Sequence, residues 1–204
     1  MKLALMLAAA ALFAAPAFAA PAFAADEITE CDRLAAHGSD PEHIAPAVSE
    51  DAMNKAAAQA ACEAATQKDP NNRRLRYQLG RAYFYDGKFA QAMPHLEFAA
   101  NAGSQQAQFV LGYIIDNGYG GVAKDPCKVE DLWVKSARQG RMAAQVSYPH
   151  HVVRGLFKGC TQQADIAEME QFIAGAKPQA SGYYEQMLVS MIAEEFAAFK
   201  AKQK

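Results

Sequence analysis

The sequence lacks the patterns that anchor the common types of active site. It contains no Ser-x-x-Lys, Gly-x-Ser-x-Gly or His-Glu-x-x-His pattern and no phosphate-binding loop of the Walker type. Nucleophilic, zinc-dependent and nucleotide-dependent catalysis therefore have no anchor in the sequence. We expect no enzyme activity, no catalytic residue, no cofactor and no bound metal, and we expect the function to reside in a binding surface.

The sequence has no marked excess of charge and few residues that favour strands. Its 20 Lys and Arg residues are balanced by 22 Asp and Glu residues, which leaves a formal net charge of −2. This balance excludes the basic surface expected of a nucleic-acid-binding protein. Half of the residues are apolar, but the excess is Ala, the best helix former, instead of branched residues that favour strands. The composition predicts an all-α protein.

Long apolar runs are missing except at the N-terminus, where residues 1–24 have the features of a signal peptide. Lys2 supplies a positive start, and the apolar run of residues 3–15 is too short to span a bilayer. Small residues allow cleavage after Ala19 or after Ala24, and we favour Ala24. The alternative is an uncleaved anchor. We therefore expect a periplasmic or secreted protein with no membrane insertion after cleavage.

Two copies of one pattern occupy the centre of the chain. Leu79-Gly80-x-x-Tyr83 is repeated as Leu111-Gly112-x-x-Ile115, so Gly80 and Gly112 lie 32 residues apart. This period is typical of helical hairpins stacked in an array. The pattern predicts a right-handed α-α superhelix, or solenoid, of about three helical hairpins with capping helices at both ends.

The second copy also resembles a known repeat family. Its glycines continue as Gly118-x-Gly120-x-Val122-x-x-Asp125, and an aromatic residue precedes the ending Ser136-Ala137-x-x-Gly140. This string resembles the Sel-one-like repeat, a relative of the tetratricopeptide repeat. The resemblance covers residues 72–140 and implies a protein that binds other proteins. A third unit follows, but Pro149 replaces the family's glycine, which leaves the path of residues 146–160 open.

These features divide the sequence into four parts. After the signal peptide, residues 25–70 are expected to form N-terminal capping helices over about 28–36 and 49–67. Residues 71–160 are expected to carry the repeats, with Asp125-Pro126 starting the return helix of the second unit. Residues 161–204 are expected to form C-terminal capping helices over about 162–175 and 179–200.

Four cysteines remain after export, and no Cys-x-x-Cys pattern suggests redox chemistry. Four cysteines allow three pairings. The spacings of 31 residues between Cys31 and Cys62 and of 33 residues between Cys127 and Cys160 are each close to one repeat. If equivalent points of neighbouring hairpins lie side by side, Cys31–Cys62 and Cys127–Cys160 are the favoured disulfides.

One cluster offers an alternative, because His150 and His151 precede Cys160, and imidazole and thiolate can bind zinc or copper. Adjacent residues on a helix point about 100° apart, so the two rings do not converge easily on one ion. Export also favours a disulfide for Cys160. We therefore predict no metal site.

The strongest candidate for function is the inner groove of the array. The first helix of each hairpin lines the concave face in such arrays, and Arg and aromatic residues are enriched at binding hot spots. The alternative is that Tyr77 and Tyr113 pack between hairpins. The predicted groove residues are Arg74, Tyr77, Arg81, Tyr85, Phe109, Tyr113, His150 and Arg154, with Gln106 among them.

The sequence thus predicts an exported adaptor or regulator that binds another protein or an extended peptide bearing carboxylates in this groove. It does not define the oligomeric state. One alternative is a cysteine-rich protein with penicillin-binding or β-lactamase activity, as the family resemblance implies for some secreted members. Those members carry a close cysteine pair within each repeat, which this sequence lacks. The other alternative is a cell-wall glycan binder that stacks sugars on its aromatic residues.

Overall fold

The computed structural model describes residues 27–203, and the predicted signal peptide lies outside this range. The described residues form α-helices and short 3-10 turns, with no strand. None of these helices is long and apolar enough to cross a membrane. The predicted all-α class is confirmed. The helices are α1 (Glu30–Ala35), α2 (Lys55–Lys68), α3 (Arg73–Tyr85), α4 (Phe89–Asn101), α5 (Gln105–Asn117), α6 (Pro126–Arg138), α7 (Met142–Val153), α8 (Ile166–Ala176) and α9 (Tyr183–Ala201), and the 3-10 turns are η1 (Tyr119–Gly121) and η2 (Lys177–Gln179).

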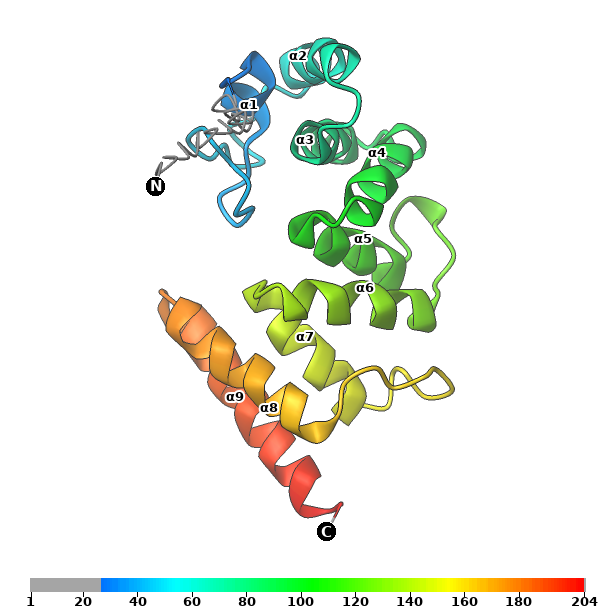
Figure 1. Cartoon of the computed structure of the whole chain (residues 1–204), viewed down its shortest axis with the longest axis vertical. Helices are drawn as coiled ribbons and strands as arrows, with labels where there is room; N and C mark the ends of the chain where they lie inside the picture. Colours follow the sequence, from blue (N-terminus) through cyan, green and yellow to red (C-terminus); the bar gives the residue numbers. More distant parts are fainter. Residues whose placement is uncertain (1–26, 204) are drawn as a thin grey trace, which may run out of the picture.

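The helices follow one another along an arc, from α1 and α2 at one end to α8 and α9 at the other (Figure 1). Each helix packs on the next, and α3 with α4 and α5 with α6 form the two most closely packed pairs. Helix α1 also contacts α3, and α9 contacts α7, so at both ends of the array the first helices of successive pairs are neighbours. This stacking confirms the predicted solenoid.

The repeated glycines allow the two helices of a hairpin to approach closely. A Cβ on Gly80 would lie 2.7 Å from Cγ of Leu96 in α4, and a Cβ on Gly112 would overlap the indole ring of Trp133 in α6. Trp133 is held there because its Nε1 donates a hydrogen bond to the carbonyl of Phe109 at 3.0 Å. The Leu-Gly pattern is therefore a packing signal: each glycine receives a large side chain from the return helix.

The turn between α5 and α6 also follows the predicted chemistry. Gly118 ends α5 with a φ of 71°, a conformation that favours glycine. Asp125 caps α6, since its carboxylate accepts hydrogen bonds from the backbone N–H groups of Cys127 and Lys128, and Pro126 occupies the first turn. Cap and proline confirm the predicted start of this helix.

Helix α2 begins later than the predicted residue 49. The side chain of Asn54 accepts a hydrogen bond from the N–H of Ala57 and caps the helix, while residues 50–52 form a turn. The predicted start at residue 49 was wrong, because the hydroxyl oxygen of Ser49 accepts a hydrogen bond from the N–H of Ala52 and caps only this turn. As a result, residues 36–54 form a long non-helical segment beside α3.

The third unit keeps its helix through the proline. Helix α7 contains Pro149 and ends at Val153, after which residues 154–165 form a turn-rich segment before α8. Buried Glu130 fixes that segment, because its carboxylate accepts hydrogen bonds from the hydroxyl of Tyr148 at 3.2 Å and from the N–H of Gln163 at 3.0 Å. Helix α8 then packs on α7.

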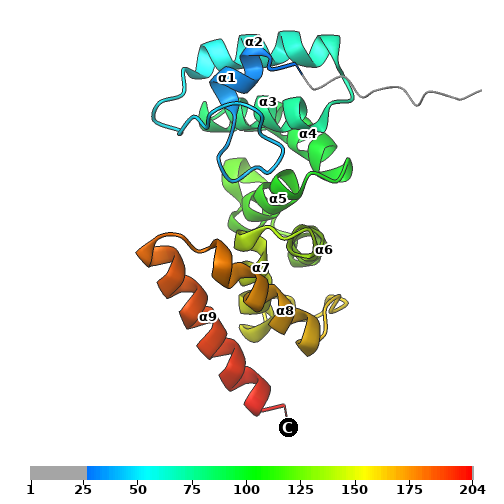
Figure 2. The same cartoon turned by 60° about the vertical axis from the view of Figure 1, so that its left-hand side comes forward.

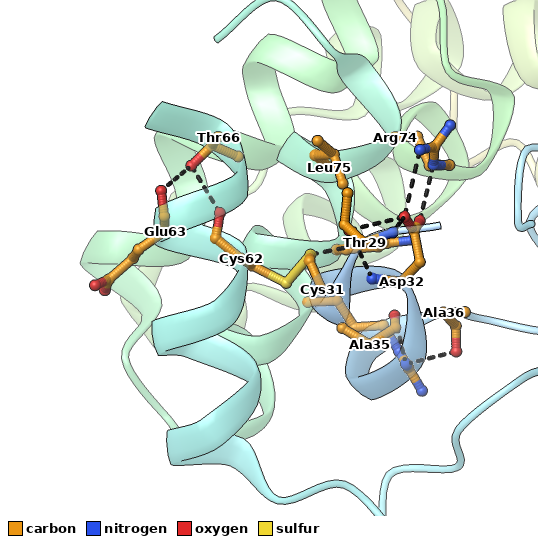
Figure 3. The surroundings of a disulfide bond; sticks show 12 residues. Thr29, Cys31, Asp32, Ala35, Ala36, Cys62, Glu63, Thr66, Arg74 and Leu75 are labelled. Atoms are coloured by element: carbon orange, nitrogen blue, oxygen red, sulfur yellow. Dashed lines mark hydrogen bonds and ion pairs between the residues drawn. A yellow bond between two sulfur atoms is a disulfide. The ribbon is translucent and has the colours of Figure 1, made fainter. Parts of the chain in front are cut away.

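Two disulfides join the pairs that the spacing favours, Cys31 with Cys62 and Cys127 with Cys160. The expected geometric reason was wrong for the first bridge. It joins α1 and α2, which form one helix pair, instead of equivalent points on successive hairpins (Figure 3). The second bridge ties the start of α6 to the segment after α7. Both bridges fit an oxidising compartment such as the periplasm or the cell exterior.

Candidate functional site

The predicted groove is not a single open surface. The segment of residues 36–54 and the turn before α9 lie on the same side of the arc in both views (Figures 1 and 2). Residues of the first segment cover the face of α3 that carries Arg81, and α9 itself lies beside His150 and Arg154 of α7. The groove residues therefore fall into a buried group and two separate cavities.

Arg74 and Tyr77 belong to the buried group, so their predicted exposure was wrong. Arg74 donates from Nε to Oδ1 of Asp32 in α1 at 2.9 Å, with both side chains buried (Figure 3). Tyr77 is 1% exposed, and its hydroxyl accepts a hydrogen bond from Nε2 of Gln106 at 3.0 Å. Burial raises the pKa of Tyr77 far above its usual value. These residues, with buried Gln106, hold the N-terminal helices and α5 against α3.

Arg81 is also buried, which corrects its predicted place on an open face. Its guanidinium donates hydrogen bonds to the carbonyls of Ala35, Ala36 and Val48 at 2.6–3.1 Å. Its Nε has no hydrogen-bond partner among the described residues. The side chain forms no ion pair with any described carboxylate, so its charge is buried without a paired anion.

The remaining residues of α3 and α5 line a cavity of about 430 Å³, which we call the aromatic cavity. Its aromatic rings contact one another: Phe109 and Tyr113 are stacked with centroids 6.5 Å apart, and the hydroxyl groups of Tyr113 and Tyr119 lie 3.1 Å apart. That hydrogen bond, with burial, raises the pKa of Tyr113. The volume lies in the range of small-ligand sites. The lining residues are His37, Glu50, Tyr77, Arg81, Phe84, Tyr85, Leu96, Gln106, Phe109, Val110, Tyr113, Ile114, Tyr119 and Arg141.

The most important residue that the sequence prediction missed is Arg141. It precedes α7, and its Nε donates a hydrogen bond to Oε1 of Gln106 at 2.5 Å. Its guanidinium carbon lies 5.2 Å from the centre of the Phe109 ring, as that of Arg81 lies 4.9 Å from the Tyr85 ring. Burial lowers the pKa of Arg141. The aromatic cavity thus contains two guanidinium groups, each stacked on an aromatic wall.

The pKa of His37 is affected by the positive charges of the same cavity. Burial, followed by the charges of Arg81, Arg141 and His43, lowers its pKa to about 4. Its Nδ1 accepts a hydrogen bond from the N–H of Ser39 at 3.1 Å, which places the ring proton of the neutral form on Nε2. At neutral pH His37 is therefore an uncharged hydrogen-bond donor at this cavity.

A second cavity adjoins the first across Arg141, which lines both. This polar cavity has a volume of about 520 Å³ and lies between the segment after α1 and the start of α9. Gln179 Nε2 donates to Oε1 of Gln145 at 3.0 Å and to the carbonyl of Gly140 at 3.1 Å beside it. The two cavities therefore meet at the side chain of Arg141.

His150 and Arg154 lie elsewhere, in a cavity of about 540 Å³ between α7 and α9. His150 Nδ1 lies 2.7 Å from Oε2 of Glu195, and Nη1 of Arg154 lies 3.9 Å from Oε1 of the same carboxylate. Apolar residues of α9, such as Leu188 and Met191, complete this cavity. The structure therefore does not bring His150 and Arg154 together with the aromatic cavity.

The histidines do not form a metal cluster. His151 Nε2 lies 3.3 Å from Oδ2 of Asp116, and its ring packs edge-on against Trp133, while Cys160 is in a disulfide. Across residues 27–203, no group of three or more His, Cys, Asp or Glu side chains is arranged to hold a metal ion.

Comparison with solved structures finds a likeness to a helical repeat protein. The crystal structure of a Sel1 repeat protein from Oxalobacter formigenes matches this structure with a TM-score of 0.51 over 63% of this chain and 95% of that chain. The chain has the fold of a Sel1 repeat protein. At 20% sequence identity this likeness shows the Sel1-repeat fold alone. No family model matches the sequence, and no curated protein sequence matches it.

Proposed function

We propose that this chain is an exported Sel1-type adaptor or regulator that binds a segment of another protein in the aromatic cavity. The carrying observation is that the cavity combines exposed aromatic surface with two guanidinium groups that form no ion pair with a described residue. Tyr113 is 43% exposed and Tyr119 is 38% exposed, although most aromatic side chains of the described repeats are packed.

Two further features support a binding role. The Sel1-repeat fold is a scaffold used for protein binding, and the cavity walls lie largely on helices that pack on one another. The aromatic cavity draws its walls from α3, α4, α5 and η1, from the segment of residues 36–54, and from Arg141 before α7. Such a site is formed before a ligand arrives, which reduces the entropy cost of binding.

The test is site-specific photocrosslinking in the native host. A photoreactive amino acid at Tyr113 should capture a discrete partner, and excess unlabelled protein should compete for it. The matched control places the same group at Gln91, which is exposed on α4 outside the cavity. Identical crosslinks from both positions, or none from Tyr113, would overturn the proposal.

A second candidate, a cell-wall glycan binder, is favoured by one observation. The rings of Tyr113 and Tyr119 lie 5.5 Å apart at the mouth of the cavity, where a sugar ring could stack on them. Cosedimentation with purified cell wall that is lost on Tyr113→Ala would favour this function. Nothing in residues 27–203 favours the penicillin-binding alternative, because each disulfide spans 31 or 33 residues instead of a close pair.

A further inference from the structure

We infer that the aromatic cavity recognises an internal acidic residue of an extended partner peptide, with an aromatic residue next to it. This inference rests on the proposed function and specifies the partner's chemistry. Arg141 supplies the direct contact to the carboxylate, and the aromatic rings hold the neighbouring side chain.

The charge balance of the cavity favours an anion. Arg141 uses Nε for Gln106, and its two terminal nitrogens make no hydrogen bond or ion pair with a described residue. Arg81 adds a buried positive charge to the same cavity. The carboxylate among the lining residues of the aromatic cavity belongs to exposed Glu50, which pairs with neither arginine. Glu185 lines the polar cavity together with Arg141, but its carboxylate accepts hydrogen bonds from the N–H groups of Ser181 and Gly182 and forms no ion pair with Arg141. Arg81 is buried and Arg141 is half-buried, and neither pairs with a described carboxylate, so a ligand carboxylate would compensate the cost of holding these charges away from water.

The hydrogen-bonding groups point to the same ligand. Arg141 offers N–H donors in a planar fork, which matches a carboxylate in two-bond geometry. Neutral His37 offers its Nε2 proton as another donor at the cavity. Phe109 and Tyr113 form a stacked wall beside these donors. A carboxylate beside an aromatic ring satisfies both parts of the site.

The continuity of the cavities indicates an internal residue instead of a chain end. Arg141 belongs to the lining of both the aromatic cavity and the polar cavity, so the two cavities meet at its side chain. A peptide can therefore continue on both sides of the arginine. In the polar cavity its backbone would meet amide groups such as those of Gln105 and Gln139.

The experiment measures the affinity of two probe peptides for the exported protein with both disulfides intact. The probes are acetyl-Gly-Ser-Phe-Glu-Gly-Ser-amide and the same peptide with Gln in place of Glu, titrated by isothermal calorimetry at low salt. We expect the Glu peptide to bind at least tenfold more tightly. Arg141→Gln should abolish this preference, Arg141→Lys should keep part of it, and Glu50→Gln should increase it.

The matched control is Arg154→Gln, which removes an arginine from the α7–α9 cavity and should leave the preference unchanged. Thermal melting of each variant shows whether it is folded. Equal affinities for the two peptides, no binding of either, or a preference that survives Arg141→Gln would overturn the inference. Tighter binding of a Phe-Glu peptide with a free C-terminal carboxylate would also overturn the internal placement. A specific crosslink from Tyr113 would still support the proposed function in each of these cases.

Discussion

Nε of Arg74 lies 2.9 Å from Oδ1 of Asp32, and this buried ion pair joins the N-terminal helix α1 to the first repeat helix α3. Gln78 donates a further hydrogen bond to Oδ1 at 3.0 Å, and the N–H of Thr29 donates to Oδ2 at 2.9 Å. Burial raises the pKa of Asp32, but these hydrogen bonds outweigh it and hold the pKa below its usual value. The capping helix is therefore attached by charge as well as by a disulfide.

Arg74→Met should destabilise the protein by about 3–5 kcal/mol, because it leaves the Asp32 carboxylate buried without its cation. The matched control is Arg33→Met, which breaks an exposed pair with Glu30 and should cost less than about 1 kcal/mol. Urea unfolding measures both values. A similar small cost for both variants would contradict the structural role assigned to Arg74.

The repeated glycines give a second prediction. Gly112→Ala should destabilise by about 1–3 kcal/mol, because the new methyl group overlaps Trp133, whose indole is fixed by its hydrogen bond to Phe109. Gly80→Ala should also destabilise, because the methyl group would lie 2.7 Å from Cγ of buried Leu96 and 3.2 Å from its backbone nitrogen. Gly182→Ala is the control, with no atom within 4 Å of the new carbon. Equal melting temperatures for the Gly112 and Gly182 variants would contradict this order.

Much of the fold could be predicted from local signals. The Leu-Gly pairs mark helix contacts, and Asp125-Pro126 marks a helix start, because each signal depends on residues within one hairpin. The two disulfide pairs also follow the spacing, although the first joins helices of one pair. These features depend on residues that are close in the sequence, so they can be predicted from sequence patterns.

The candidate site could be predicted only in part, because its exposure depends on contacts between distant segments. The helical pattern places Arg81 on the face of α3 that lines the aromatic cavity. The carbonyls that bury its guanidinium belong to residues 35–48, and no sequence pattern predicts that this segment packs against α3. Arg141 lies in a turn, outside the helical faces that the prediction considered. Tyr85, Phe109 and Tyr113 line the aromatic cavity because their helix positions alone determine their direction.

The two disulfides should have different local effects. Replacing Cys127 and Cys160 by Ser should release residues 154–165 and speed trypsin cleavage after exposed Lys158. Replacing Cys31 and Cys62 should lower the free energy of unfolding by about 3–4 kcal/mol in the chain-entropy model but leave that cleavage site protected. Mass spectrometry of timed digests separates the two. Equal cleavage rates at Lys158 in both variants would contradict this assignment.

Asp40 gives a prediction about pH. Its side chain is 1% exposed, and Oδ2 has no hydrogen-bond partner among the described residues. Burial raises its pKa from 3.8 to about 6. The folded protein therefore binds a proton between these values that the unfolded chain releases. Acidification from pH 7 towards pH 4 should stabilise the fold through this residue, and Asp40 should be a net cost above pH 6.

Asp40→Asn removes this cost while its side-chain oxygen can still accept the N–H of Glu42, as Oδ1 does at 3.1 Å. The variant should be more stable than the wild type by about 2 kcal/mol at pH 7.5, and this gain should fall to less than half at pH 4.5. Asp51→Asn is the exposed control and should show no such change. The lowered pKa of His37 destabilises the fold as the pH falls from 6.5 to 4. This effect is the same in the wild type and the variant, so it cancels in the difference between their free energies of unfolding. A gain of equal size at both pH values would show that Asn improves packing, and that the buried charge of Asp40 is not the cause.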